Sequence, residues 1–178
     1  MKKWRLITSE KIFSSNWLGL ERRTYEANGI TRDDYYHVER PDYVMIIAHD
    51  AVGKIVVEQQ YRRGADEILY ELPAGTIEQG ETPVSAAKRE LTEETGYTDK
   101  ARLIGALYAQ AGFMSMRAHV VVVDIEGSGE HKKLDADEAI ELHLFSLEEI
   151  QDMIQTKKMT EMSSISALHL YELNGSTG

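Results

Sequence analysis

The chain has 178 residues, a length typical of one domain with a single substantial core. Its 30 acidic residues outnumber 20 Lys and Arg residues, and at a formal net charge of -10 we expect no nucleic-acid partner. The absence of cysteine excludes disulfides, cysteine-ligated zinc and a thiol nucleophile, and it fits a reducing, cytoplasmic compartment. The basic start, residues 1–5, is followed by no long apolar run, so we expect no signal peptide. The purest apolar run, residues 120–123, is too short to span a bilayer, so we expect no membrane partner.

The first 40 residues are rich in aromatic and charged side chains and lack a helical period. Four runs in them are strand candidates: 4–8, 12–13, 17–26 and 30–39. Asn28-Gly29 predicts a hairpin between the last two, because both residues tolerate positive φ. We expect a small antiparallel sheet over residues 1–40. It either packs on a second copy of the chain or forms an ordinary edge of the main sheet.

Residues 41–178 alternate between strand and helix patterns, and we expect them to form the main domain. The strand candidates are 43–49, 54–61, 68–72, 101–111, 117–125 and 139–145. The run at 43–49 is continuously apolar, which suits a strand buried on both faces. Ser146 and Glu149 form a capping box that starts a helix, and a last helix ends near Asn174. The pattern predicts an α/β (α+β) class: a mixed β-sheet sandwiched between helices.

A helix of about three turns is predicted after Thr82, which can cap it, with Pro83 at the first helical position. Val84, Ala87 and Leu91 form its apolar stripe. Gly96 then supplies the end signal of this helix.

This helix carries Glu90, Glu93 and Glu94 at i, i+3 and i+4, so the three carboxylates emerge as neighbours on one face. Like charges so placed weaken an isolated helix. Arg89 is one group that can offset the repulsion, and a bound divalent cation is another, since hard cations favour clustered carboxylate oxygens. A solvated acidic face is the third interpretation.

The spacing of these residues resembles the signature of the Nudix hydrolase family. Every fixed place of that signature is filled: Gly75, Glu81, Arg89, Glu90, Leu91, Glu93, Glu94 and Gly96, with Tyr97 as the apolar ending. The resemblance implies the Nudix fold and a domain, 41–178, that hydrolyses phosphoanhydrides with a divalent metal.

The resemblance also implies roles for the site residues. Glu90 and Glu94 would be metal ligands, Glu93 a ligand or the support of one, and the Ala74 carbonyl a further oxygen. With oxygen ligands alone, Mg²⁺ is the expected cofactor and Mn²⁺ a substitute. Arg89 would orient the glutamates, or serve only as a structural ion pair. Glu81 is expected to organise the loop before the helix.

The general base is expected on a late loop, as in relatives that cleave ADP-ribose. Asp135-Ala-Asp137-Glu138 lies in the matching region. We assign Glu138 as the base, with Asp137 as the second candidate. A solvated acidic loop explains the same run.

Two tracts, 58–62 and 71–75, resemble those of ADP-ribose and nucleotide-sugar hydrolases. Arg62 could hold a diphosphate bidentately with help from Arg40, although both could be surface ion pairs. Tyr36 or Trp17 could stack on a nucleobase, or simply pack. The tract at 108–113 has alanines where this subgroup carries prolines, which leaves room for GDP-mannose.

We therefore expect a Mg²⁺-dependent hydrolase of ADP-ribose-like or GDP-mannose-like nucleoside diphosphate sugars, releasing a nucleoside monophosphate and a sugar phosphate. By resemblance, residues 1–40 would complete a homodimer. The alternatives are a nucleoside-triphosphate or dinucleoside-polyphosphate hydrolase and a non-catalytic nucleotide-sugar sensor.

Overall fold

The computed structural model describes residues 2–95, 100–125 and 140–175, and for Glu94 and Thr95 it describes the backbone alone. The chain divides into two compact units. Unit 1 comprises Met1–Asp42 and Tyr108–Arg117, and unit 2 comprises Tyr43–Leu107 and Ala118–Gly178.

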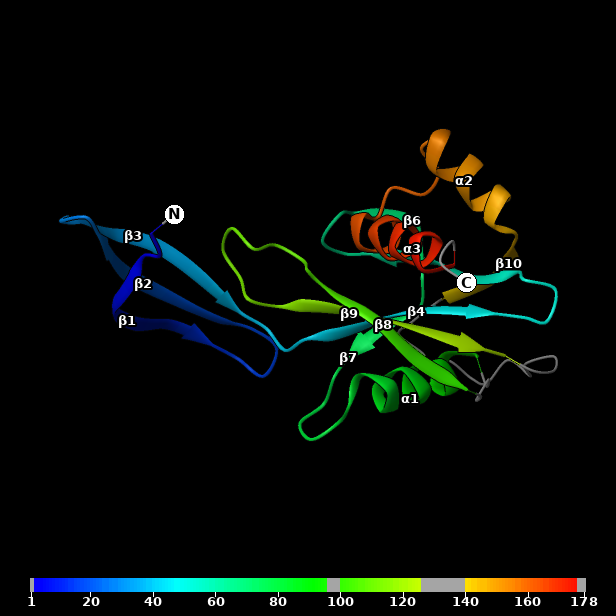
Figure 1. Ribbon diagram of the computed structural model, residues 1–178, viewed down its shortest axis with the longest axis horizontal. Coiled ribbons are helices and arrows are strands. Elements are labelled where there is room, and N and C mark those ends of the chain that lie inside the picture. The colour runs from blue at the N-terminus through cyan, green and yellow to red at the C-terminus, as the bar shows by residue number, and fades with distance from the viewer. Residues whose placement is uncertain (1, 96–99, 126–139, 176–178) are drawn as a thin grey trace. The chain divides into compact units, whose positions relative to one another are not determined.

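Unit 1 is built on a three-stranded antiparallel sheet in the order β1-β2-β3 (Figure 1). Its strands are β1 (Arg5–Ser14), β2 (Gly19–Ala27) and β3 (Ile30–Glu39). The predicted hairpin is confirmed, with positive φ at Asn28 and Gly29. The two brief candidates at 4–8 and 12–13 were wrong as separate strands, because they belong to one strand. Register shifts within β1 break the side-chain alternation, which hid the continuity.

The second part of unit 1, residues 108–117, lies along β3. The Val38 N–H donates to the Phe113 carbonyl at 2.8 Å, and Val38 forms an isolated parallel bridge with Met114. The predicted strand 101–111 was therefore too long. It ends at Tyr108, because the N–H groups of Phe113 and Met114 turn back onto the Gln110 carbonyl.

Unit 2 holds a mixed sheet in the order β10-β5-β4-β9-β8, with β6 paired to β5 and β7 paired to β4. Its strands are β4 (Tyr43–His49), β5 (Ile55–Arg62), β6 (Glu67–Glu71), β7 (Ala74–Thr76), β8 (Ala101–Tyr108), β9 (Arg117–Asp124) and β10 (Ile140–Phe145). β4 runs parallel to β9 and antiparallel to β7. The short β7 is not foreseen by the sequence analysis, since three residues carry no alternation.

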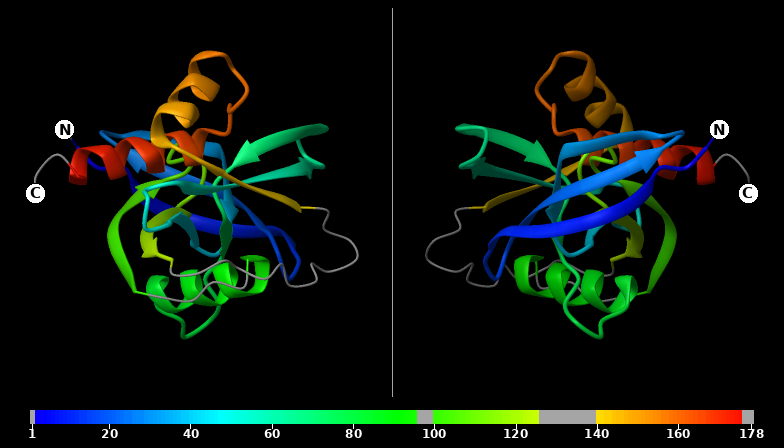
Figure 2. Two further views of the ribbon diagram at one scale, coloured as in Figure 1. Left: turned by 90° about the vertical axis from the view of Figure 1, so that its right-hand side faces the viewer. Right: turned by 90° about the vertical axis from the view of Figure 1, so that its left-hand side faces the viewer.

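Helix α1 (Pro83–Thr95) covers one face of this sheet, and α2 (Leu147–Gln155) and α3 (Met162–Gly175) cover the other, as Figures 1 and 2 show. β4 is buried on both faces, which confirms the prediction. Met45 and Ile47 belong to the cluster that packs α2 and α3, whereas Val44 and Ile46 belong to the cluster that packs α1. The predicted sandwich of helix, mixed sheet and helix is thus confirmed.

Local signals set the helix starts where the sequence predicts them. α1 begins at Pro83, and the Ser85 N–H donates to the Thr82 hydroxyl at 3.1 Å. Ser146 and Glu149 form the predicted capping box at α2. Within the described ranges, no helix has the length and apolar character needed to cross a membrane.

Candidate active site on helix α1

Gly75 in β7 lies against Glu90 in α1. A Cβ added to Gly75 would lie 1.9 Å from the Glu90 carboxyl carbon, far inside van der Waals contact. The absence of a side chain at Gly75 therefore lets the Glu90 carboxylate rest against the β7 backbone. The strand position and the helix position depend on each other.

The Glu90 carboxylate is held in an environment that disfavours its charge. Burial raises its pKa, Arg89 opposes that rise, and the like charges of Glu93 and Glu81 add to it. The Glu90 side chain is 16% exposed, and its Oε1 lies 2.9 Å from Arg89 Nη1. A partly buried carboxylate with acidic neighbours gains free energy from a nearby cation.

Arg89 ties the helix to the loop before it. Its Nε and Nη2 donate to Glu81 at 2.9 and 3.0 Å, and Nη2 also donates to the Thr76 carbonyl at 3.0 Å. These bonds raise the pKa of Arg89 and lower the pKa of Glu81 to about 2, with the Arg89 hydrogen bond as the largest cause of the latter. Glu81 also accepts the Glu78 N–H at 2.9 Å, which places it in the loop role that the sequence predicts.

Of the other predicted ligand side chains, Glu93 is less constrained than Glu90. The Glu93 side chain is exposed and lies 3.4 Å from Arg89 Nη1. The Glu94 side chain lies outside the described residues. In the part of the chain that is described, no group of three or more histidine or acidic side chains is already arranged to hold a metal ion.

The residues that are described nevertheless fit a hard divalent cation. Glu90 presents carboxylate oxygens beside β7, and Ala74, one residue before Gly75, brings a backbone carbonyl to the same strand. An all-oxygen set of carboxylate and carbonyl ligands suits Mg²⁺ and Mn²⁺.

Arg62 is the last residue of β5. Its side chain lies on the face of the sheet that α1 covers. Val56 packs in the α1 cluster, and alternation along β5 places Glu58 and Arg62 on the same face. Arg62 donates from Nε and Nη2 to the two carboxylate oxygens of Glu71, each at 2.8 Å.

Glu71 has no role predicted from the sequence, although it opens the tract 71–75. Its partnership with Arg62 is diagonal across the hairpin, since the register pairs Arg62 with Glu67 and Glu71 with Glu58. Counting along strands does not reveal such a contact. The offset is four residues along β6, and the length of both side chains allows the contact.

The other predicted substrate-binding residues belong to unit 1. Trp17 lies in the loop between β1 and β2 and is 74% exposed, and Tyr36 on β3 is 52% exposed. Arg40 follows β3 and is exposed. The predicted general base, Glu138, and its second candidate, Asp137, lie outside the described residues.

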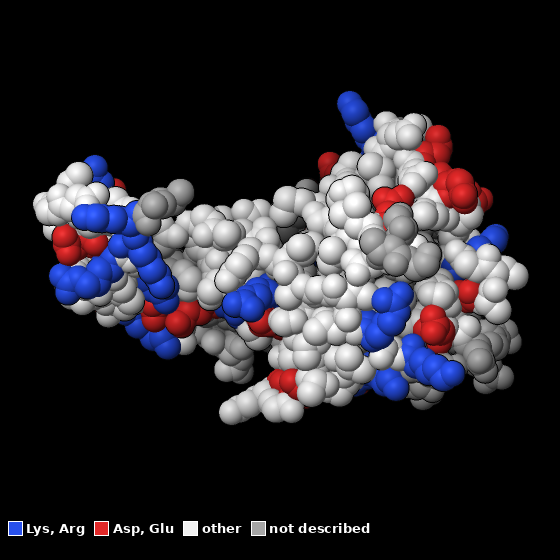
Figure 3. All heavy atoms as spheres, in the orientation of Figure 1, with Lys and Arg blue, Asp and Glu red and all other residues white. Residues whose placement is uncertain are grey.

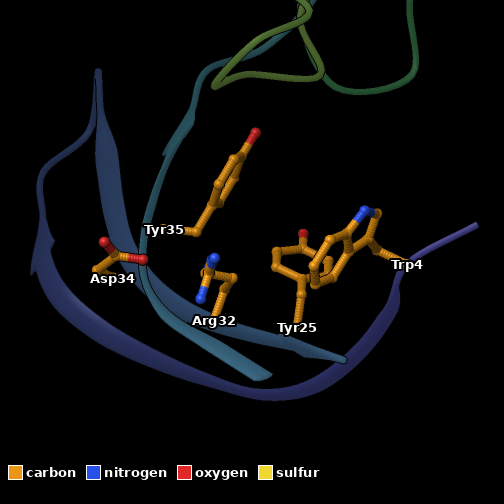
Figure 4. A pocket seen from close by; sticks show the side chains of 5 residues that line it. All are labelled: Trp4, Tyr25, Arg32, Asp34 and Tyr35. Atoms are coloured by element: carbon orange, nitrogen blue, oxygen red, sulfur yellow. The ribbon is translucent and has the colours of Figure 1, made fainter. Parts of the chain in front are cut away.

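Unit 1 also contains a hollow of about 480 Å³ that the sequence does not reveal. Figure 4 shows the side chains around it, from β2, β3 and the residue before β1: Trp4, Tyr25, Arg32, Asp34 and Tyr35. The Tyr25 and Tyr35 rings meet edge to face, with centroids 5.2 Å apart. None of the predicted substrate-binding residues lines this hollow.

Known proteins share both the sequence pattern and the fold of this chain. A family model described as the NUDIX domain matches residues 39–165. The ADP-ribose pyrophosphatase of Bacillus subtilis (strain 168) is 30% identical over 171 residues, covering 95% of this chain and 92% of that protein. The ADP-sugar pyrophosphatase of Mus musculus is 34% identical over 138 residues, covering 68% of this chain and 62% of that protein.

A solved structure adds to these likenesses. It is described as the crystal structure of an ADP compounds hydrolase, and it superposes with a TM-score of 0.83 at 23% identity. The superposition covers 99% of this chain and 97% of that chain. At this identity the likeness shows the fold alone.

Proposed function

Because this chain belongs to the Nudix hydrolase family, we propose that it hydrolyses the pyrophosphate bond of nucleoside diphosphate sugars. The products are a nucleoside monophosphate and a sugar phosphate. The relatives named for ADP-ribose and ADP-sugars make an ADP-sugar the first substrate to test.

The observation that carries the proposal is the fit of Glu90 against Gly75, with Arg89 beside it. Gly75 and Glu90 belong to the family signature, and the structure gives their spacing a physical reason, since any larger residue at position 75 would displace the carboxylate. Arg89 reaches Glu81, Glu90 and the Thr76 carbonyl at the same time. This corner of unit 2 is preorganised to present carboxylate oxygens at one place.

The proposal assigns the metal to Glu90, Glu94 and the Ala74 carbonyl, with Glu93 as a further ligand or support. When bound, Mg²⁺ lowers the pKa of coordinated water and neutralises charge on the phosphate oxygens. Arg89 keeps Glu90 oriented through its charge-assisted hydrogen bond. Glu138 is assigned as the base that accepts the proton of the attacking water.

The residues proposed to contact the substrate are chosen by the charge or the aromatic ring of their side chains. Arg62 and Arg40 are cations that can bind the diphosphate, and the planar fork of a guanidinium matches phosphate oxygens. Tyr36 and Trp17 have exposed rings that can stack on the nucleobase. Alanines stand at 109 and 111, where the ADP-ribose subgroup carries prolines, so GDP-mannose is also tested as a substrate.

Unit 1 has features of a surface that associates with a second copy. Every residue of β1 is exposed, and an isolated sheet of three strands needs an apolar face that packs on something. Large apolar side chains are exposed throughout it: Trp4, Leu6, Ile7, Ile12, Phe13, Trp17, Leu18, Ile30 and Tyr36. The proposal therefore includes a homodimer formed through unit 1, and a cytoplasmic location that fits the cysteine-free sequence.

Charge does not oppose that association. Figure 3 shows basic and acidic side chains beside one another over the three-stranded sheet. Arg5 pairs with Glu26 at 3.1 Å, and Arg22 pairs with Glu10 at 2.7 Å. These ion pairs neutralise part of the charge locally before two copies meet.

A substrate panel tests the proposed activity. The chain is incubated with Mg²⁺ and, separately, ADP-ribose, GDP-mannose, other sugar nucleotides, nucleoside triphosphates and dinucleoside polyphosphates, and the phosphomonoester products are identified. We expect AMP and ribose 5-phosphate from ADP-ribose. Preferential turnover of triphosphates or dinucleoside polyphosphates would overturn the substrate class, and binding of sugar nucleotides without turnover would make the chain a sensor.

A further inference from the structure

Arg62 and Glu71 form a forked ion pair along the β5–β6 hairpin, with Arg62 at the end of β5 and Glu71 at the end of β6. Two parallel hydrogen bonds of 2.8 Å join the guanidinium to both oxygens of one carboxylate. This geometry fixes the orientation of the guanidinium plane as well as its position. We propose that Glu71 is a positioning residue that aims Arg62 at the diphosphate of the substrate, an inference that rests on the proposed function.

The two partners differ in exposure. The Glu71 side chain is 6% exposed and the Arg62 side chain is 44% exposed. The carboxylate is therefore a buried anchor, and the guanidinium extends from it toward solvent. A substrate can reach Arg62 but cannot displace Glu71 without uncovering a buried charge.

The hydrogen bonds leave part of the guanidinium available. Arginine has five N–H donors, and Glu71 takes one from Nε and one from Nη2. One donor on Nη1 and the second donor on Nη2 form another edge of the guanidinium, which does not face Glu71. That edge has the spacing to bind two oxygens of a phosphate.

The surroundings keep Arg62 charged and in place. The hydrogen bonds that Arg62 donates to Glu71 are the largest cause that raises the pKa of Arg62, and the charges of Glu58 and Glu161 act in the same direction. Glu58 lies directly across from Glu71 in the sheet and is 1% exposed. A second carboxylate beside the anchor holds the cation at this end of β5.

The location of the pair on the sheet connects it to the metal helix. Glu58 and Leu142 are opposite one another in the β5–β10 register, and Leu142 packs on the α1 cluster. Cross-strand partners share a face, so Glu71 and Glu58 lie on the α1 face as well. A substrate whose pyrophosphate approaches Glu90 therefore approaches the face that carries Arg62.

Without this anchor, Arg62 would lose its fixed direction. An arginine side chain has several rotatable bonds and samples many rotamers when nothing orders it. In Glu71→Gln, an amide NH₂ replaces one carboxylate oxygen and cannot accept a hydrogen bond from Arg62. One of the two bonds is lost, and the other is weaker because its acceptor is no longer an anion.

The test is a double-mutant cycle with a direct binding readout. Calorimetry measures the Kd of α,β-methylene ADP-ribose with Mg²⁺ for wild type, Glu71→Gln, Arg62→Ala and the double variant. We expect each single change to raise Kd roughly tenfold, and the double variant to bind no worse than Arg62→Ala. In steady-state assays with ADP-ribose, KM should rise more than kcat falls.

A neighbouring acid provides the matched control. Glu67 is exposed and is the register partner of Arg62, yet in the described part of the chain Arg62 forms its ion pair with Glu71 and not with Glu67. Glu67→Gln removes the same charge from the same hairpin, so its Kd should stay near the wild-type value. If Glu67→Gln lost as much affinity for the analogue as Glu71→Gln, the cause would be the net charge of the hairpin and the inference would be overturned.

The remaining outcomes separate this inference from the proposed activity. If Glu71→Gln binds the analogue as tightly as wild type, or if the two single effects multiply, Glu71 does not act through Arg62. If the substrate panel shows no ADP-sugar hydrolysis but the cycle is non-additive, the positioning role stands and the activity assignment is wrong. If Glu71→Gln does not fold, Glu71→Asp replaces it in the cycle. This variant keeps the charge but shortens the side chain that holds Arg62. If Glu71→Asp binds the analogue as tightly as wild type, the inference is also overturned.

Discussion

The carboxyl group of Glu90 occupies the space that a side chain on Gly75 would need. The two residues come from different elements, β7 and α1, and neither position can change without consequence for the other. β7 is in turn held by β4, where Val44 pairs with Gly75 and Met45 with Ala74. The proposed metal site is therefore fixed by the main sheet as well as by the helix.

Gly75→Ala should remove most of the activity. The added methyl group must push Glu90 away from β7, and a displacement of about 1 Å at a reacting centre can cost roughly 100-fold in rate. The measurement is kcat with ADP-ribose and Mg²⁺, with circular dichroism to verify folding. Gly64→Ala is the matched control, because a Cβ there meets nothing within 4 Å. Activity of Gly75→Ala within a few-fold of wild type would contradict the assigned geometry.

Metal removal should abolish turnover, and Glu94→Gln should do nearly the same. A chelator removes the ion that the proposal requires, and the glutamine variant keeps the size of the side chain while losing its charge. Activity after chelation should return on adding Mg²⁺ or Mn²⁺. Calorimetric titration of Mn²⁺ into the variant should show weakened binding. Wild-type rates in Glu94→Gln would show that Glu94 is not a ligand.

Acid stability should depend on Glu81. Its pKa is lowered from the usual 4.5 to about 2 in the folded chain, chiefly by Arg89. The unfolded chain therefore binds the proton first, so the stabilisation is complete above about pH 4.5 and is lost as the pH falls toward 2. Thermal unfolding across that range should give a shallower dependence of Tm on pH for Glu81→Gln than for wild type. Identical slopes would show that the pair contributes nothing in acid.

Association through unit 1 should be visible in solution. Sedimentation equilibrium should give a mass twice the 20.2 kDa of the chain. Phe13→Glu places a charge among the exposed apolar side chains of β1 and should shift the mass toward the monomer. Val52→Glu is the control, since Val52 is 82% exposed in unit 2. A monomeric wild-type chain, or equal effects of the two variants, would rule out this interface.

Local chemistry in the sequence was enough to predict much of the fold. Asn28-Gly29, the Thr82-Pro83 start of α1 and the Ser146 cap act within a few residues, so their spacing is visible along the chain. The continuous apolar run in β4 reports burial on both faces, and the structure confirms it. Glu90 and Glu93 follow the same logic, because a spacing of three residues makes them neighbours on a helix.

Contacts between elements could not be predicted in this way. The clash that reserves position 75 for glycine depends on how β7 meets α1, and β7 itself is too short to leave a pattern. The Arg62–Glu71 pair joins residues that the register does not place opposite one another. The hollow lined by Trp4 and Tyr35 likewise needs the curvature of a sheet that sequence periodicity does not describe.

The most direct measurement is a crystal structure of the chain with Mn²⁺ and α,β-methylene ADP-ribose. The account predicts anomalous density for the metal between the Glu90 carboxylate and the Ala74 carbonyl, with the bridging methylene group of the analogue beside it. Metal density at another place, or a Glu90 side chain turned away from β7 into solvent, would contradict the account.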